Sequence, residues 1–83
     1  MNMPLRCRMA GNYAQNLRSE RMAARFTQIG LARAAAVGRL RIVRIESGQS
    51  VPSLDEAVRL ATALDVPLER LVTGRWRPSR SLR

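Results

Sequence analysis

The sequence contains no histidine and no lysine, one cysteine and three aromatic residues among its 83 positions. Without histidine and with Cys7 alone, a single chain cannot assemble a zinc site, a disulfide framework or a Ser-His or Cys-His dyad. The six acidic residues are scattered along the chain and form no tight acidic motif. We therefore expect a protein that is not an enzyme and that binds neither a metal nor a cofactor.

Long apolar runs are also missing. No stretch approaches the roughly 20 apolar residues that span a bilayer, and the N-terminus lacks the apolar segment of a signal peptide. A chain of 83 residues is expected to form one domain with a small core. These features predict a single soluble domain in the reducing cytoplasm, without a membrane partner.

The charge is strongly positive and unevenly distributed. All 15 basic residues are arginine, against six acidic residues. Residues 1–45 hold nine arginines and one acid, residues 46–74 two arginines and five acids, and residues 75–83 four arginines. The preference for arginine can reflect a GC-rich genome, but guanidinium also suits phosphate and guanine edges. The asymmetry favours one surface that binds a polyanion, as in nucleic-acid-binding proteins.

Helical periodicity predicts five helices, and neither strand-like alternation nor an internal repeat is present. The expected helices span residues 12–25, 28–35, 39–46, 54–64 and 67–72. Residues 1–11 show no helical period, so we expect a flexible basic N-terminal arm there. Residues 12–74 then form the folded domain and residues 75–83 a basic C-terminal tail.

Local signals support these boundaries. The predicted N-caps are Asn12, Thr27 and Ser53, the last of which forms a capping box with Glu56. Gly48 stands where a left-handed residue ends the third helix. The apolar stripe of the fourth helix is expected to comprise Leu54, Ala57, Val58, Ala61 and Leu64.

Segments 28–35 and 39–46, joined by a three-residue turn, have the spacing of a helix-turn-helix. Three motifs accompany them: Thr27, Gln28, Leu31 and Ala32; then Val37, Ile42, Ile45, Glu46 and Gly48; then Pro52, Ser53, Leu54, Leu60, Ala61, Leu64, Leu68 and Leu71. With these motifs in register, residues 17–71 resemble the family of phage repressors, Cro proteins and xenobiotic-response-element regulators. The resemblance implies an all-α, five-helix, lambda-repressor-like DNA-binding domain.

In that family the segment matching residues 39–46 reads DNA. On a helical wheel Ile42 and Ile45 face inward, and the outer side presents Arg39, Leu40, Val43 and Arg44 as candidate base-reading residues. An arginine can pair with the O6 and N7 atoms of guanine, and apolar side chains can pack on thymine methyl groups. Alternatively, the arginines bind phosphate and the apolar pair contacts a protein.

Further roles follow from the resemblance. The expected phosphate-binding residues are Thr27, Gln28, Arg41, Ser47, Gln49 and Ser50. Arg21 and Glu46 are expected to form a structural ion pair between helices. Leu71, Val72 and Trp76 occupy the region where such proteins dimerise, although Trp76 can equally cover its own core.

The sequence thus predicts a double-stranded DNA-binding transcriptional regulator, a repressor that acts as a homodimer on a palindromic operator. A phage or plasmid regulator, a restriction controller and an antitoxin all fit. The main alternative is an antitoxin or adaptor whose role is to bind a partner protein, a toxin or another regulator. A sequence-neutral DNA or RNA binder is a second alternative.

Overall fold

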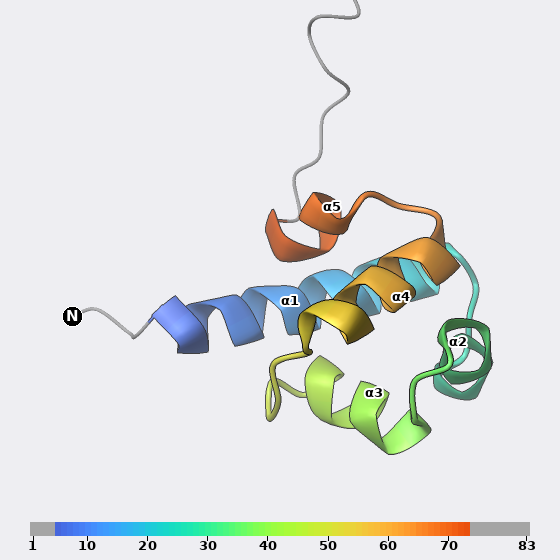
Figure 1. Ribbon diagram of the computed structural model, residues 1–83, viewed down its shortest axis with the longest axis horizontal. Helices are drawn as coiled ribbons and strands as arrows, with labels where there is room; N and C mark the ends of the chain where they lie inside the picture. The colour runs from blue at the N-terminus through green and yellow to red at the C-terminus, as the bar shows by residue number, and fades with distance from the viewer. Residues whose placement is uncertain (1–4, 74–83) are drawn as a thin grey trace, which may run out of the picture.

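The computed structural model describes the backbone of residues 5–73 and the side chains of residues 13–73. Over this range the chain forms five helices and no strand: α1 (Leu5–Ala23), α2 (Gln28–Ala35), α3 (Arg39–Glu46), α4 (Leu54–Leu64) and α5 (Leu68–Thr73). Helix α1 runs the length of the molecule, with α5 on one side and α2 and α3 on the other (Figure 1). The predicted all-α, five-helix architecture is confirmed.

The core lies where the five helices meet. Six side chains are fully buried: Leu17, Leu31, Ile42, Ile45, Leu60 and Leu71. Every helix contributes at least one of them, and burial of each such side chain stabilises the fold by about 1.5–3 kcal/mol. No helix can therefore leave the assembly without exposing part of this core. None of the helices in the described range is long and apolar enough to cross a membrane.

The first helix is longer than the sequence indicated. It begins at Leu5 rather than at residue 12, so Asn12 lies inside α1 and does not cap it. The prediction of an irregular arm is wrong for residues 5–11, whereas residues 1–4 lie outside the described range. Most of residues 5–10 are good helix formers, and Gly11 alone disfavours the helix by only about 1 kcal/mol. One glycine does not stop a helix that neighbouring residues and tertiary packing support.

The apolar stripe of α4 also differs from the prediction. Leu54 is 74% exposed and Val58 is 45% exposed, whereas Leu60 is fully buried. Leu54 is the first residue of the helix, and Val58 is turned about 100° from the buried Ala57. Two large apolar side chains therefore lie on the surface at the beginning of α4.

The capping box of α4 is confirmed and carries an additional cation. The Ser53 hydroxyl accepts a hydrogen bond from the Glu56 amide at 3.1 Å, and Glu56 Oε1 accepts one from the Ser53 amide at 2.9 Å. Arg41 donates to both oxygens of the same carboxylate, at 2.8 and 2.6 Å. The hydrogen bonds from Arg41 and Ser53 lower the pKa of Glu56 from 4.5 to about 2.

This shift predicts how stability depends on pH. Since the folded state keeps Glu56 ionised down to about pH 2, its contribution to the free energy of unfolding is complete above pH 4.5 and disappears as pH falls towards 2. Glu56→Gln should therefore be less stable than the unchanged protein by the order of 1 kcal/mol at pH 7. Urea unfolding at several pH values measures this difference, which should shrink below pH 4.5. A difference that stays constant down to pH 2.5 would contradict the role given to the Glu56 charge.

Candidate nucleic-acid interface

Helices α2 and α3 are joined by a turn of three residues, Ala36, Val37 and Gly38. The Thr27 hydroxyl caps α2 by accepting the Gly30 amide at 2.9 Å, as predicted. Ala36 then adopts a left-handed conformation with φ 57°, which ends α2 and costs a residue with a Cβ about 1–2 kcal/mol. Val37 is buried in the core, so the turn is anchored on its inner side.

The outer side of α3 carries the predicted base-reading residues. Ile42 and Ile45 are fully buried, whereas Arg39 and Arg44 are exposed and Leu40 is 63% exposed. Val43 is half-buried. Helix α3 thus presents two arginines and an exposed leucine to solvent on one face, which we call the reading face (Arg39, Leu40, Val43 and Arg44). The structure brings these four residues together, while their contacts with bases stay a prediction.

Ion pairing divides the arginines into two groups. Arg21, Arg41, Arg59 and Arg70 each pair with a carboxylate within the described part of the chain. Among the nine arginines whose side chains are described, those that form no ion pair are Arg18, Arg25, Arg33, Arg39 and Arg44. All five belong to the segment from α1 to α3, and the sequence alone did not single out Arg18, Arg25 or Arg33.

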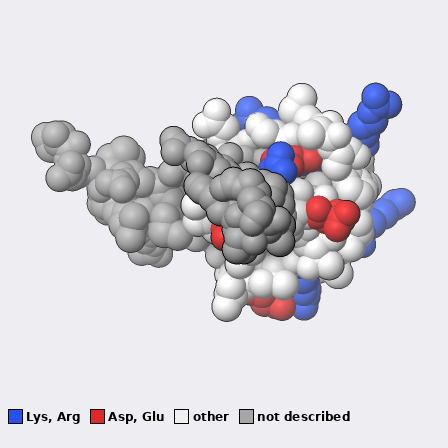
Figure 2. Space-filling model, turned by 90° about the horizontal axis from the view of Figure 1, so that it is seen from above, with Lys and Arg blue, Asp and Glu red and all other residues white. Residues whose placement is uncertain are grey.

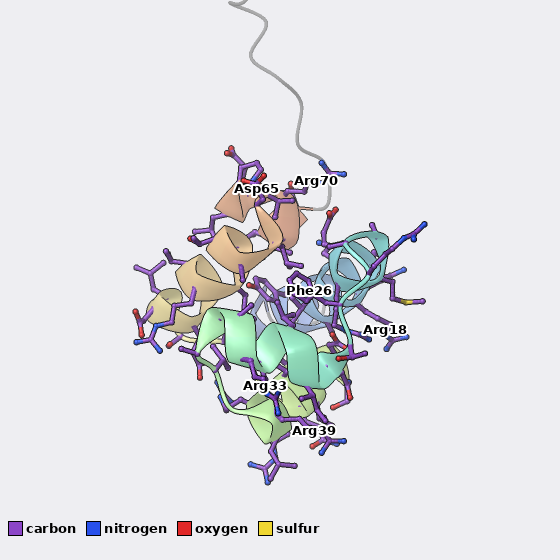
Figure 3. All side chains as sticks on the ribbon, turned by 90° about the vertical axis from the view of Figure 1, so that its right-hand side faces the viewer. Arg18, Phe26, Arg33, Arg39, Asp65 and Arg70 are labelled. Atoms are coloured by element: carbon purple, nitrogen blue, oxygen red, sulfur yellow. The ribbon has the colours of Figure 1, made fainter. Side chains whose placement is uncertain are left out.

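The acidic residues show the opposite distribution. Four of them are neutralised by arginines, and the two without an ion pair in the described range, Asp65 and Glu69, lie at the end of α4 and in α5. Figure 3 shows Asp65 at one end of the molecule and Arg33 and Arg39 at the other, beside α2 and α3. On the face that carries α5, acidic side chains are visible between arginines that lie mostly at its edge (Figure 2). Free positive charge is therefore concentrated on the side of the helix-turn-helix.

The beginning of α2 carries two of the predicted phosphate-binding residues. The amides of its first turn have no partner within the helix, and the positive end of the helix dipole favours an anion there. The Gln28 side chain donates to Glu46 Oε1 at 3.1 Å, which holds it beside this helix end. Its amide group has a second hydrogen that can still reach a phosphate.

The loop after α3 contains three further predicted phosphate-binding residues. Ser47 and Gln49 are exposed and Ser50 is half-buried. The amides of Gln49 and Ser50 both donate to the Arg44 carbonyl, as does the Ser47 hydroxyl at 3.0 Å. The loop is therefore ordered by its own hydrogen bonds, while the side chains of Gln49 and Ser50 form no hydrogen bond with a described residue and keep their donors for a phosphate.

Arg41 departs from its predicted role. It lies towards α4, where it binds the Glu56 carboxylate through two hydrogen bonds and donates to the Val51 carbonyl at 3.3 Å. Its charge is already neutralised by Glu56, which weakens its attraction for a phosphate.

The predicted ion pair between Arg21 and Glu46 is present. Arg21 donates to both carboxylate oxygens of Glu46, at 2.6 and 3.1 Å, and also to the Phe26 carbonyl at 2.9 Å. Glu46 is only 5% exposed and additionally accepts from Gln28. The pair holds α1, α2 and α3 in a fixed arrangement. Its hydrogen bonds within the protein assign it a structural role.

The predicted dimer interface needs a correction. Leu71 is fully buried in the core of its own chain, so it is not available to a partner. Val72 is half-buried, and Trp76 lies outside the described residues. Val72 lines an apolar groove of about 170 Å³ together with Tyr13, Val51, Pro52, Leu54, Ala57 and Leu68. The exposed Leu54 and Val51 of this groove were not predicted as interface residues.

Two short helices joined by a tight turn, with an exposed cationic face on the second, define a helix-turn-helix nucleic-acid-binding domain. The helix-turn-helix family matches residues 17–71, which is most of the chain. The chain therefore belongs to this family, in its Cro and phage-repressor branch, and is a DNA-binding transcriptional regulator, as the sequence motifs predicted.

One similar solved structure is that of the restriction-modification controller protein C.AhdI from Aeromonas hydrophila. It is 34% identical to this chain, with a TM-score of 0.72, and the match covers 75% of this chain and 94% of that one. A comparison with curated protein sequences gives no match.

The buried ion pair generates a stability prediction. Arg21→Leu leaves the Glu46 carboxylate buried without its cation and should lower the free energy of unfolding by about 3–5 kcal/mol. Combining Arg21→Leu with Glu46→Leu removes both charges and should recover a large part of this loss. Urea unfolding of both variants measures the two effects. A double variant no more stable than Arg21→Leu would show that the loss does not arise from an unpaired charge.

Proposed function

We propose that the protein is a transcriptional repressor that binds a palindromic operator as a homodimer, with α3 in the major groove. The observation that carries the proposal is the position of the free arginines. All five lie in the segment from α1 to α3, and two of them, Arg39 and Arg44, flank the exposed Leu40 on the reading face. A surface that combines unpaired cations with a protruding helix suits a duplex, because cations neutralise phosphates while side chains on the helix reach base edges.

Repression needs no residue beyond the DNA-binding surface and a dimer, because a bound dimer can block access to a promoter. The likeness to a restriction-modification controller favours that setting over a phage, plasmid or antitoxin setting for this chain. A cytoplasmic, non-enzymatic regulator remains our interpretation of the sequence.

The apolar groove supplies an interface for a second copy of this chain. A twofold interface must be complementary to itself, so one patch has to contain both a protrusion and a hollow. Leu54 protrudes with 74% exposure directly beside the groove that it helps to line. None of the reading-face residues lines the groove, so a partner bound in the groove does not contact the reading face through these residues. The proposed interface thus contains Val72, as the sequence predicted, and it contains Leu54 in place of Leu71.

The alternative of an adaptor that binds another protein rests on Leu40. A large apolar side chain that is 63% exposed on a binding face suits a protein surface as well as a thymine methyl group. Selection of DNA sequences distinguishes the two, because an adaptor would show no preference for a palindrome.

The reading face generates the first functional prediction. Duplexes selected from a random pool by the unchanged protein at physiological salt should share a palindrome. Arg44→Ala should relax the preference at one base position in each half-site, a loss of about 1–3 kcal/mol of discrimination. Arg25→Ala removes the same charge outside the reading face and should leave the base preference unchanged. Absence of any enriched sequence with the unchanged protein would exclude the proposed repressor.

The groove generates the second functional prediction. Leu54→Glu places a charge in the apolar interface, while glutamate suits the first turn of a helix and so should not unfold α4. Sedimentation equilibrium should show a dimer for the unchanged protein and a monomer for the variant, with much weaker binding to the selected palindrome. Met22→Glu changes another exposed apolar residue, 62% exposed in α1, and should remain a dimer. A dimeric Leu54→Glu variant would place the interface elsewhere.

A further inference from the structure

An open pocket of about 310 Å³ lies between α1 and the C-terminal end of α3. It is lined by Ala14, Gln15 and Arg18 of α1 and by Glu46, Ser47 and Gly48. Arg18 is exposed and is the only cation among these residues. Its Nη2 atom donates to the Glu46 carbonyl at 3.3 Å, which directs the guanidinium towards the loop that follows α3.

The loop itself supplies no positive charge to an anion, and its backbone amides are already used. The amides of Ser47, Gly48, Gln49 and Ser50 donate to carbonyls of α3, and the Ser47 hydroxyl does the same. Residues 47–52 contain no arginine. The side chains of Gln49 and Ser50 can donate neutral hydrogen bonds to a phosphate, but a cation at this end of α3 has to come from another element.

Arg18 has the free charge and the free donors for that role. It forms no ion pair with any described carboxylate, and the nearby Glu46 carboxylate is directed to Arg21 and Gln28 instead. A guanidinium has five N–H groups, and the long bond to the Glu46 carbonyl uses one of them. Gln28, at the beginning of α2, contacts the same Glu46 residue, so the two side chains flank the end of α3. Figure 3 shows Arg18 at the side of the molecule, away from Asp65.

We propose that Arg18 binds a phosphate of the DNA backbone in this pocket and so holds the C-terminal end of α3 against the duplex. The inference rests on the proposed function, and it adds a contact made by α1 to those made by the helix-turn-helix. Because the contact is to phosphate, it contributes affinity on every sequence and no base preference.

The test measures the salt dependence of binding from about 50 to about 200 mM salt, on a duplex selected by the unchanged protein and on a random-sequence duplex of equal length. A phosphate contact contributes about 0.9 to the slope of log K against log salt, hence about 1.8 for two copies. Arg18→Gln should therefore bind both duplexes more weakly at low salt. Raising the salt over this range weakens binding by both proteins, and the factor by which Arg18→Gln weakens should be about tenfold smaller than the factor for the unchanged protein. Arg18→Lys should retain most of the slope.

The matched control is Arg70→Gln, which removes one arginine from α5, where it pairs with Glu20. Its slope should change by less than half as much. Thermal unfolding of each variant distinguishes the proposed phosphate contact from a purely structural role of Arg18 in capping α3. Loss of a structural role would lower Tm and leave the salt slope unchanged. A slope for Arg18→Gln equal to that of the unchanged protein overturns this inference alone. Failure of the unchanged protein to bind DNA with a salt dependence overturns the proposed function as well.

Discussion

The buried carboxylate of Glu46 is the contact on which the arrangement of the first three helices depends. It accepts two hydrogen bonds from Arg21 of α1 and one from Gln28 of α2, and it belongs to the last turn of α3. An ionised group that is 5% exposed is tolerated only when its oxygens are satisfied, so the angles between these helices have little freedom. The pair adds little net stability for its cost, but it fixes the position of the reading face relative to the beginning of α2.

The same residue links the interior to the DNA-facing surface. Its carboxylate is directed inward, while its carbonyl at the end of α3 accepts a hydrogen bond from Arg18. Arg21, one turn along α1 from Arg18, is committed to the carboxylate. Two neighbouring arginines of α1 therefore have different roles because one meets a buried anion and the other meets only a carbonyl dipole, which leaves its charge free.

The sequence predicted much of this structure, because caps and apolar periodicity are local signals. Thr27, Ser53 and the inward position of Ile42 follow from residues within one or two turns. Pairings between distant elements have no such local signal, and the ion pair between Arg21 and Glu46 was predicted only because the family resemblance implies it. The partner of Arg41 is Glu56, beyond an irregular loop, and nothing within α3 distinguishes Arg41 from the free arginines. Similarly, Leu71 is equally suited to a core and to an interface, and only the packing of α5 against α1 decides between them.

Ion pairing leaves the unpaired positive and negative charges on different parts of the domain. Four of the six acidic residues neutralise arginines, and Asp65 and Glu69, at the end of α4 and in α5, keep a negative charge that repels DNA. The unpaired arginines of the described range all lie in the segment from α1 to α3. Attraction of these arginines to DNA and repulsion of the unpaired acids therefore orient the domain before any base contact forms. This field is indifferent to sequence. We therefore propose that discrimination between operators comes from the few side chains of the reading face, where the exposed Leu40 lies among cations and can pack on a thymine methyl group.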